Sequence, residues 1–142
     1  MSTASITQQG LAAGSMVKMQ AYTDHKSDIV NIPDEGVRIL FFISLHCMHC
    51  IDLTPEISEI ARAVPDAGFT VFSTGEREDN QEMAGYFDWD FSVISASQEE
   101  MENQFGITML PAMVLLRDGV VQLTGVVYNK DDFFKLTHKV LP

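Results

Sequence analysis

The chain has few cysteines, few basic residues and no long apolar run, and each shortage excludes a class of protein. Two cysteines among 142 residues are too few for a small disulfide-stabilised scaffold. Nine basic against twenty acidic residues give a net charge of −11, which argues against partners such as nucleic acid or an anionic lipid surface. No apolar run approaches the roughly 20 residues that a membrane-spanning helix needs.

The N-terminal residues carry no targeting signal. Residues 1–10 are rich in Ser, Thr and Gln and have neither a basic nor an apolar signal region. We expect them to form a flexible tail before one domain at residues 11–142, since hydrophobic residues make up 46% of the chain. Either the protein is cytoplasmic, or a leader or anchor has been removed from it.

Hydrophobic patterns predict a mixed order of strands and helices. Residues 37–45 form a near-continuous apolar run, typical of a central strand covered on both faces. Helical spacing over residues 53–64 predicts a helix, kinked at Pro55. Asp118 and Gly119 predict a hairpin turn. The other predicted elements are strands at 17–22, 69–73, 91–95, 112–117 and 120–126, helices at 80–87, 97–105 and 130–140, and loops at 24–36 and 76–79.

Both cysteines lie in one short motif, Cys47-Met48-His49-Cys50, between the predicted strand and helix. A thiol at a helix N-terminus is favoured as the thiolate, because the unpaired N–H groups of the first turn carry partial positive charge. The thiolate attacks disulfides, so the motif suggests redox chemistry. Two other interpretations stay open: inert buried cysteines, or a copper or zinc site in which His46 and His49 assist.

Three landmarks follow one another along the chain: ILFFISLHCMHC (39–50), Pro55, and FGITMLPAMVLLRDG (105–119). Together they resemble the thioredoxin superfamily, and within it the TlpA-like and AhpC/TSA-type thiol–disulfide oxidoreductases. The first resembles the turn that presents the redox motif, Pro55 falls where those proteins have a proline in the helix, and the last resembles the segment with their cis-proline, which is Pro111 here. The resemblance implies an α/β thioredoxin fold, a mixed central sheet flanked by helices, with an N-terminal extension and a strand–helix insertion around residues 69–95.

The resemblance also implies roles for individual residues. Cys47 would attack a substrate disulfide and Cys50 would resolve the mixed disulfide. Substrate would bind along Pro111, Leu110 and Met109, with His46 and Met48 beside them. The implied partners are protein thiols and disulfides and a redox partner protein, with no nucleic acid. The disulfide itself would be the redox group, with no other cofactor and no metal, and the chain would act as a monomer.

Two departures from the thioredoxin pattern concern the site. Thioredoxin has a buried aspartate six residues before the first cysteine, where Phe41 stands here, and a tryptophan where His46 stands. His49 is expected to stabilise the Cys47 thiolate and make the disulfide more oxidising than that of thioredoxin. The TlpA-like resemblance favours reduction in the bacterial envelope instead, so the direction of electron flow stays open.

Two further functions fit parts of the sequence. A thioredoxin-fold copper carrier would use the same cysteines, although such carriers space them more widely. Ser44-Leu45-His46-Cys47 also satisfies the Ser/Thr-x-x-Cys part of a peroxiredoxin site, but Leu40 stands where that motif begins with proline. Thiol–disulfide exchange therefore explains more of the sequence than either alternative.

Overall fold

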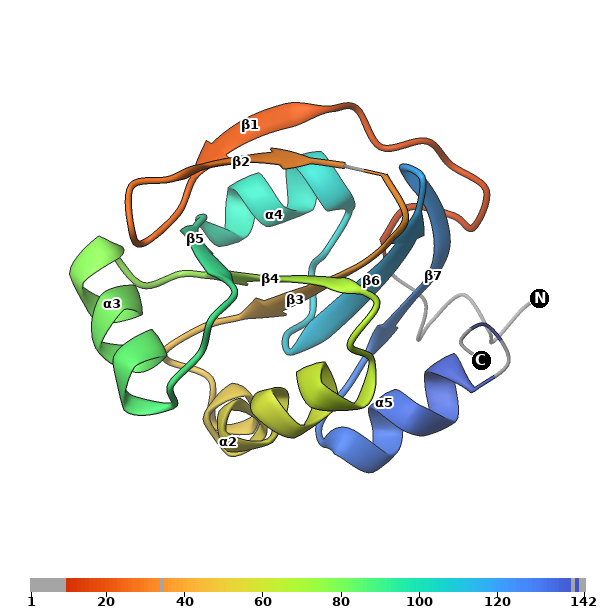
Figure 1. Ribbon diagram of the computed structural model, residues 1–142. Helices are drawn as coiled ribbons and strands as arrows, with labels where there is room; N and C mark the ends of the chain where they lie inside the picture. Colours follow the sequence, from red (N-terminus) through yellow and green to blue (C-terminus); the bar gives the residue numbers. More distant parts are fainter. Residues whose placement is uncertain (1–9, 34, 139, 141–142) are drawn as a thin grey trace.

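The computed structural model describes residues 10–33, 35–138 and 140, so the predicted tail lies outside the described residues except for Gly10. Seven strands and four helices lie in this part of the chain (Figure 1). The strands are β1 (Gln20–Thr23), β2 (Ile29–Ile32), β3 (Val37–Ile43), β4 (Gly68–Ser73), β5 (Ser92–Ser95), β6 (Ala112–Arg117) and β7 (Val120–Val126), and the helices are α2 (Met48–Ala63), α3 (Arg77–Tyr86), α4 (Gln98–Phe105) and α5 (Lys130–Thr137).

Five of the strands form one mixed sheet in the order β5-β4-β3-β6-β7. The central strand β3 pairs parallel with β4 and antiparallel with β6. The tight turn from β6 to β7 has Asp118 and Gly119 at φ angles of 51° and 84°, the left-handed conformation that two-residue hairpin turns require. The predicted mixed sheet and its terminal hairpin are confirmed.

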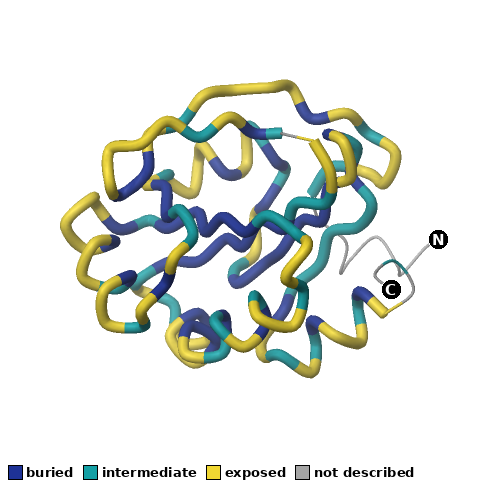
Figure 2. Tube along the Cα trace, in the orientation of Figure 1, coloured by how far each residue is buried: buried dark blue, intermediate teal, exposed yellow. Residues whose placement is uncertain are grey.

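Each face of the sheet is covered, which explains the unbroken apolar run of β3. Ile39, Phe41 and Ile43 point to the face covered by α2, α3 and α5. Leu40 and Phe42 point to the opposite face, against α4 and the β1–β2 hairpin. Successive residues of a strand face opposite ways, so both sets must be apolar. Figure 2 shows the central strands buried along their length.

The N-terminal region differs from the prediction. Residues 24–36, predicted as loop, contain β2, and the strand predicted at 17–22 begins only at Gln20. β1 and β2 pair with each other as a separate two-stranded sheet. Because this hairpin packs on α4 and not in the main sheet, only Ile32 of β2 is fully buried and the strand lacks a continuous apolar pattern.

A buried polar cluster fastens the turn of this hairpin to strand β5. Asp24, 3% exposed, accepts hydrogen bonds from the Ser92 hydroxyl (2.8 Å) and from the backbone N–H groups of Lys26 and Asp28. The His25 ring accepts the Val93 N–H at 3.1 Å. Burial acts to raise the pKa of Asp24, but these hydrogen bonds outweigh it and hold the pKa below its usual value.

Two smaller differences concern helix ends. Residues 76–79, predicted as a charged loop, begin α3, with Glu76 and Asp79 forming a reciprocal capping pair. The last helix ends at Thr137, earlier than predicted. α2 runs through Pro55, as expected from the sequence. No helix within the described residues is long and apolar enough to span a bilayer.

Candidate redox site

The site is built where the central strand turns into α2. β3 ends at Ile43, and Cys47 is the N-cap residue of α2 with extended backbone (φ −105°, ψ 119°). Its half-buried Sγ accepts a hydrogen bond from the Cys50 N–H at 3.3 Å. The thiol thus takes the place of a capping oxygen, next to the positive end of the helix.

Cys50 lies one turn further into the helix and is 1% exposed. Both thiols are free, so the structure shows the dithiol form. Burial, followed by hydrogen bonding with Cys47, raises the pKa of Cys50 to about 12, while a backbone N–H from Ser44 at 3.4 Å acts in the opposite direction. The pair therefore consists of an accessible thiol and a buried, firmly protonated one.

Strand register brings Pro111 to this turn. Phe42 of β3 lies opposite Ala112, the first residue of β6, so the residue before β6 lies beside the end of β3. The Leu110–Pro111 bond is cis, as the resemblance implied. The Cys47 thiol donates to the Leu110 carbonyl at 3.7 Å. Residues 63 positions apart in the chain therefore meet at the Cys47 sulfur.

The other expected substrate-binding residues have different degrees of exposure. Met48 is 80% exposed and Met109 is 47% exposed. Leu110 is half-buried, Pro111 is buried, and His46 is exposed and donates its backbone N–H to the Ser44 hydroxyl. The structure thus joins Leu110 directly to Cys47, places Pro111 next to it in the chain, and leaves both methionine side chains exposed. Their role in binding substrate stays a prediction.

His49 contacts a residue that the sequence analysis did not identify. Its ring lies 4.8 Å from the Tyr128 ring, centroid to centroid, at an interplanar angle of 60°. Tyr128 follows Val127, whose N–H donates to the Pro111 carbonyl at 3.2 Å. No local pattern marks Tyr128 in the sequence, because it reaches the site only through the end of β7. The expected effect of His49 on the Cys47 thiolate stays a prediction.

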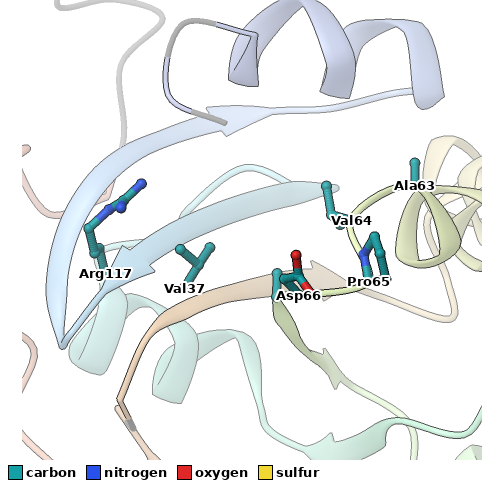
Figure 3. A pocket seen from close by; sticks show the side chains of 7 residues that line it. Val37, Ala63, Val64, Pro65, Asp66 and Arg117 are labelled. Atoms are coloured by element: carbon teal, nitrogen blue, oxygen red, sulfur yellow. The ribbon is translucent and has the colours of Figure 1, made fainter. Parts of the chain in front are cut away.

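Two features would indicate a different kind of site: a cluster of metal ligands, or a cavity lined by the predicted site residues. Among the described residues, no three or more His, Cys, Asp or Glu side chains are placed to hold one metal ion. A cavity of about 320 Å³ lies near the start of β3, the end of that strand away from Cys47 (Figure 3). It contains none of the predicted site residues and is lined by Val37, Ala63, Val64, Pro65, Asp66, Ala67 and Arg117.

Comparison with known proteins yields structural neighbours only. No protein-family model and no curated protein matches the chain. A putative thiol:disulfide interchange protein DsbE from Chlorobium tepidum is similar at a TM-score of 0.77 and 18% identity, over 92% of this chain and 96% of that one. The thioredoxin domain of a thiol-disulfide oxidoreductase from Bacteroides vulgatus is similar at 0.75 and 18%, over 93% and 99%.

A third neighbour is a secreted Mycobacterium tuberculosis disulfide oxidoreductase described as homologous to Escherichia coli DsbE. Its TM-score is 0.69 at 16% identity, over 85% of this chain and 96% of that one. All three similarities extend over 85% or more of this chain. The chain therefore has the thioredoxin fold.

Proposed function

We propose that this protein is a thiol–disulfide oxidoreductase that exchanges the Cys47–Cys50 dithiol and disulfide with protein substrates. The main support is the asymmetry of the two cysteines. Cys47 Sγ is accessible at the N-cap of α2 and contacts the Leu110 carbonyl, while Cys50 is buried one turn further into the helix. An accessible thiolate next to a resolving thiol is the arrangement that disulfide exchange requires. The proposal needs no redox group besides the two sulfurs.

The exchange proceeds in two displacements. The Cys47 thiolate attacks one sulfur of a substrate disulfide, forming a mixed disulfide and releasing the other substrate sulfur as a thiolate. Cys50 then attacks Cys47 Sγ, which forms the Cys47–Cys50 bond and releases the second substrate thiolate. An extended substrate segment beside Leu110 would hydrogen-bond to the backbone there as a short added strand.

Trapping the intermediate tests this function. A Cys50→Ala variant should accumulate a mixed disulfide with a protein disulfide substrate, because Cys47 attacks and nothing resolves the bond. Cys47→Ala is the matched control and should form none, since the remaining thiol is buried. Equal amounts of mixed disulfide in the two variants, or no disulfide exchange by the reduced wild type, would contradict the proposal.

The proposal extends to a TlpA-like role in the bacterial envelope. Two observations support it: the similarity to a protein named DsbE and the similarity to a secreted disulfide oxidoreductase. Localising the native gene product by cell fractionation tests it, and recovery in the cytoplasm alone would contradict it.

The direction of exchange depends on the midpoint potential of the Cys47–Cys50 couple. We make a separate prediction for the effect of His49 on this potential. If the imidazole stabilises the Cys47 thiolate by about 1.4 kcal/mol, the disulfide becomes about 30 mV more oxidising. A His49→Ala variant should then have a lower midpoint than the wild type in a glutathione titration. An unchanged midpoint would show that the Tyr128 contact is the main role of His49.

A further inference from the structure

Resolving the mixed disulfide requires Cys50 to lose a proton in a place that discourages it. Burial raises the pKa of Cys50 to about 12, and Cys47 is the one titratable side chain of the described residues that adds to this shift. Phe41 fills the position of thioredoxin's buried acid, fully buried against Phe69 and Phe133. The carboxylate that thioredoxin has at this position is therefore absent here, because the residue is Phe41.

The backbone N–H of Ser44 donates a hydrogen bond to the Cys50 sulfur at 3.4 Å. In the described part of the chain it is the only hydrogen-bond donor to this sulfur from outside α2, and it acts to lower the Cys50 pKa. A hydrogen bond to a charged group stabilises it by about 1.5–3 kcal/mol. The Ser44 N–H is therefore positioned to support the Cys50 thiolate.

Side-chain hydrogen bonds hold the Ser44 segment in place. The Ser44 hydroxyl, in a residue 7% exposed, accepts the His46 N–H at 3.2 Å and the Thr74 hydroxyl at 3.2 Å. Thr74 in turn accepts the Leu45 N–H at 3.2 Å. A hydroxyl offers two acceptor sites and one donor, so both acceptor sites of Ser44 are used to fix the turn between β3 and Cys47.

Strand pairing explains why these two hydroxyls meet. β3 and β4 are parallel, with Ile43 opposite Ser73, so the next residues, Ser44 and Thr74, emerge together at the carboxyl ends of the strands. Thr74 also lines an open cavity of about 350 Å³ with the N-terminal residues of α3 and α4. Water therefore has access to the Thr74 side of the hydroxyl pair.

We propose that a neutral amide–hydroxyl unit replaces the missing carboxylate: the Ser44 N–H stabilises the Cys50 thiolate, and the Ser44 and Thr74 hydroxyls position that N–H. Cys50 loses its proton to solvent and attacks Cys47 Sγ. The Cys47–Cys50 bond forms, the bond from Cys47 to the substrate sulfur breaks, and the departing thiolate takes a proton from solvent. This inference rests on the proposed disulfide exchange, and it assigns Ser44 and Thr74 as positioning residues for its second step.

A two-phase reaction separates the two steps. Reduced protein is mixed with dithiobis(nitrobenzoic acid), which releases one coloured thiolate when Cys47 attacks and a second when Cys50 resolves the mixed disulfide. Ser44→Ala and Thr74→Val should slow the second phase about 3- to 10-fold near neutral pH and move its pH midpoint upward by about half to one unit. The first phase should keep its rate and pH profile.

Two matched variants control for packing. Thr74→Ser keeps the hydroxyl and should restore the wild-type second phase. Thr54→Val removes another buried hydroxyl beside Cys50, one that donates to the Cys50 carbonyl at 2.6 Å and not to its sulfur, and should change nothing. A wild-type pH profile in Ser44→Ala, or an equal shift in Thr54→Val, would overturn the inference.

A second readout does not depend on exchange activity. In a Cys47→Ala background Cys50 is the sole cysteine, and the pH dependence of its Cβ chemical shift reports its thiolate fraction without a reagent having to reach the buried sulfur. Adding Ser44→Ala should lower that fraction about 3- to 10-fold at a given pH. If this fraction falls but the wild type fails to resolve mixed disulfides, the proposed function is wrong and the amide–hydroxyl unit stands; an unchanged fraction refutes the unit itself.

Discussion

The buried thiol makes the stability of the reduced protein depend on pH in the alkaline range. The Cys50 pKa is raised from its ordinary value of 9.0 to about 12. Above pH 9 the unfolded chain releases this proton while the folded chain keeps it, so the folded state binds more protons and stability falls as pH rises. The contribution is fully present below pH 9 and is lost progressively up to the folded pKa.

The magnitude follows from this difference between the two states. One unit above the unfolded pKa, the thiol costs the folded state about 1.4 kcal/mol relative to the unfolded state, and each further unit adds about 1.4 kcal/mol. Tyr22, whose pKa is raised from 10.0 to about 12 by burial and by Glu100, acts in the same direction. Its contribution must be removed by a control to isolate that of Cys50.

Urea unfolding of the reduced wild type and of reduced Cys50→Ala, between about pH 8 and about pH 10.5, makes the comparison. The wild type should lose about 2 kcal/mol more than the variant over this range. Oxidised wild type has no free Cys50 thiol and should lack this additional loss, while Tyr22 contributes equally to all three proteins. A difference between wild type and variant that stays constant over the range would refute the assigned environment of Cys50.

Three further perturbations test the fold that holds the site. Asp24→Asn should lower the free energy of unfolding at neutral pH by about 1–3 kcal/mol. Because the Asp24 pKa is lowered in the folded state, wild-type stability should fall as pH drops below about 4, and the variant should lack that part of the fall. Urea titrations at two pH values measure both effects. Phe42→Ala should cost about 3–5 kcal/mol in the same assay, since Phe42 is fully buried against Phe72 and Phe105. Ser97→Ala should cost about 1 kcal/mol by removing the side chain that accepts the Glu100 N–H, and an unaffected thermal midpoint would contradict that cap.

Elements with strong local signals were predictable from the sequence. The buried run of β3 and the hairpin at Asp118–Gly119 each carry their signal within a few residues, and the structure confirms both. The cap of α4 is just as local, since Ser97 stands three residues before Glu100 and the two form a reciprocal capping pair. β2 was not predictable in this way, because Ile29 is exposed and only Ile32 is fully buried. The first turn of α3 does carry a local signal, because acidic residues at 76, 78 and 79 favour a helix N-terminus.

Some features of the candidate site depend on local sequence, and others depend on contacts between residues far apart in the chain. The spacing Cys47-x-x-Cys50 can be seen in four consecutive residues, whereas the cis-proline Pro111 was predicted only from the resemblance to a known family. What places Leu110 against Cys47 and Thr74 against Ser44 is strand register, antiparallel to β6 on one side of β3 and parallel to β4 on the other. A one-residue slip of either neighbour would turn its side chains to the other face. The chemistry of the two sulfurs therefore depends on the apolar residues of β3 that fix both registers, and not only on the motif that follows them.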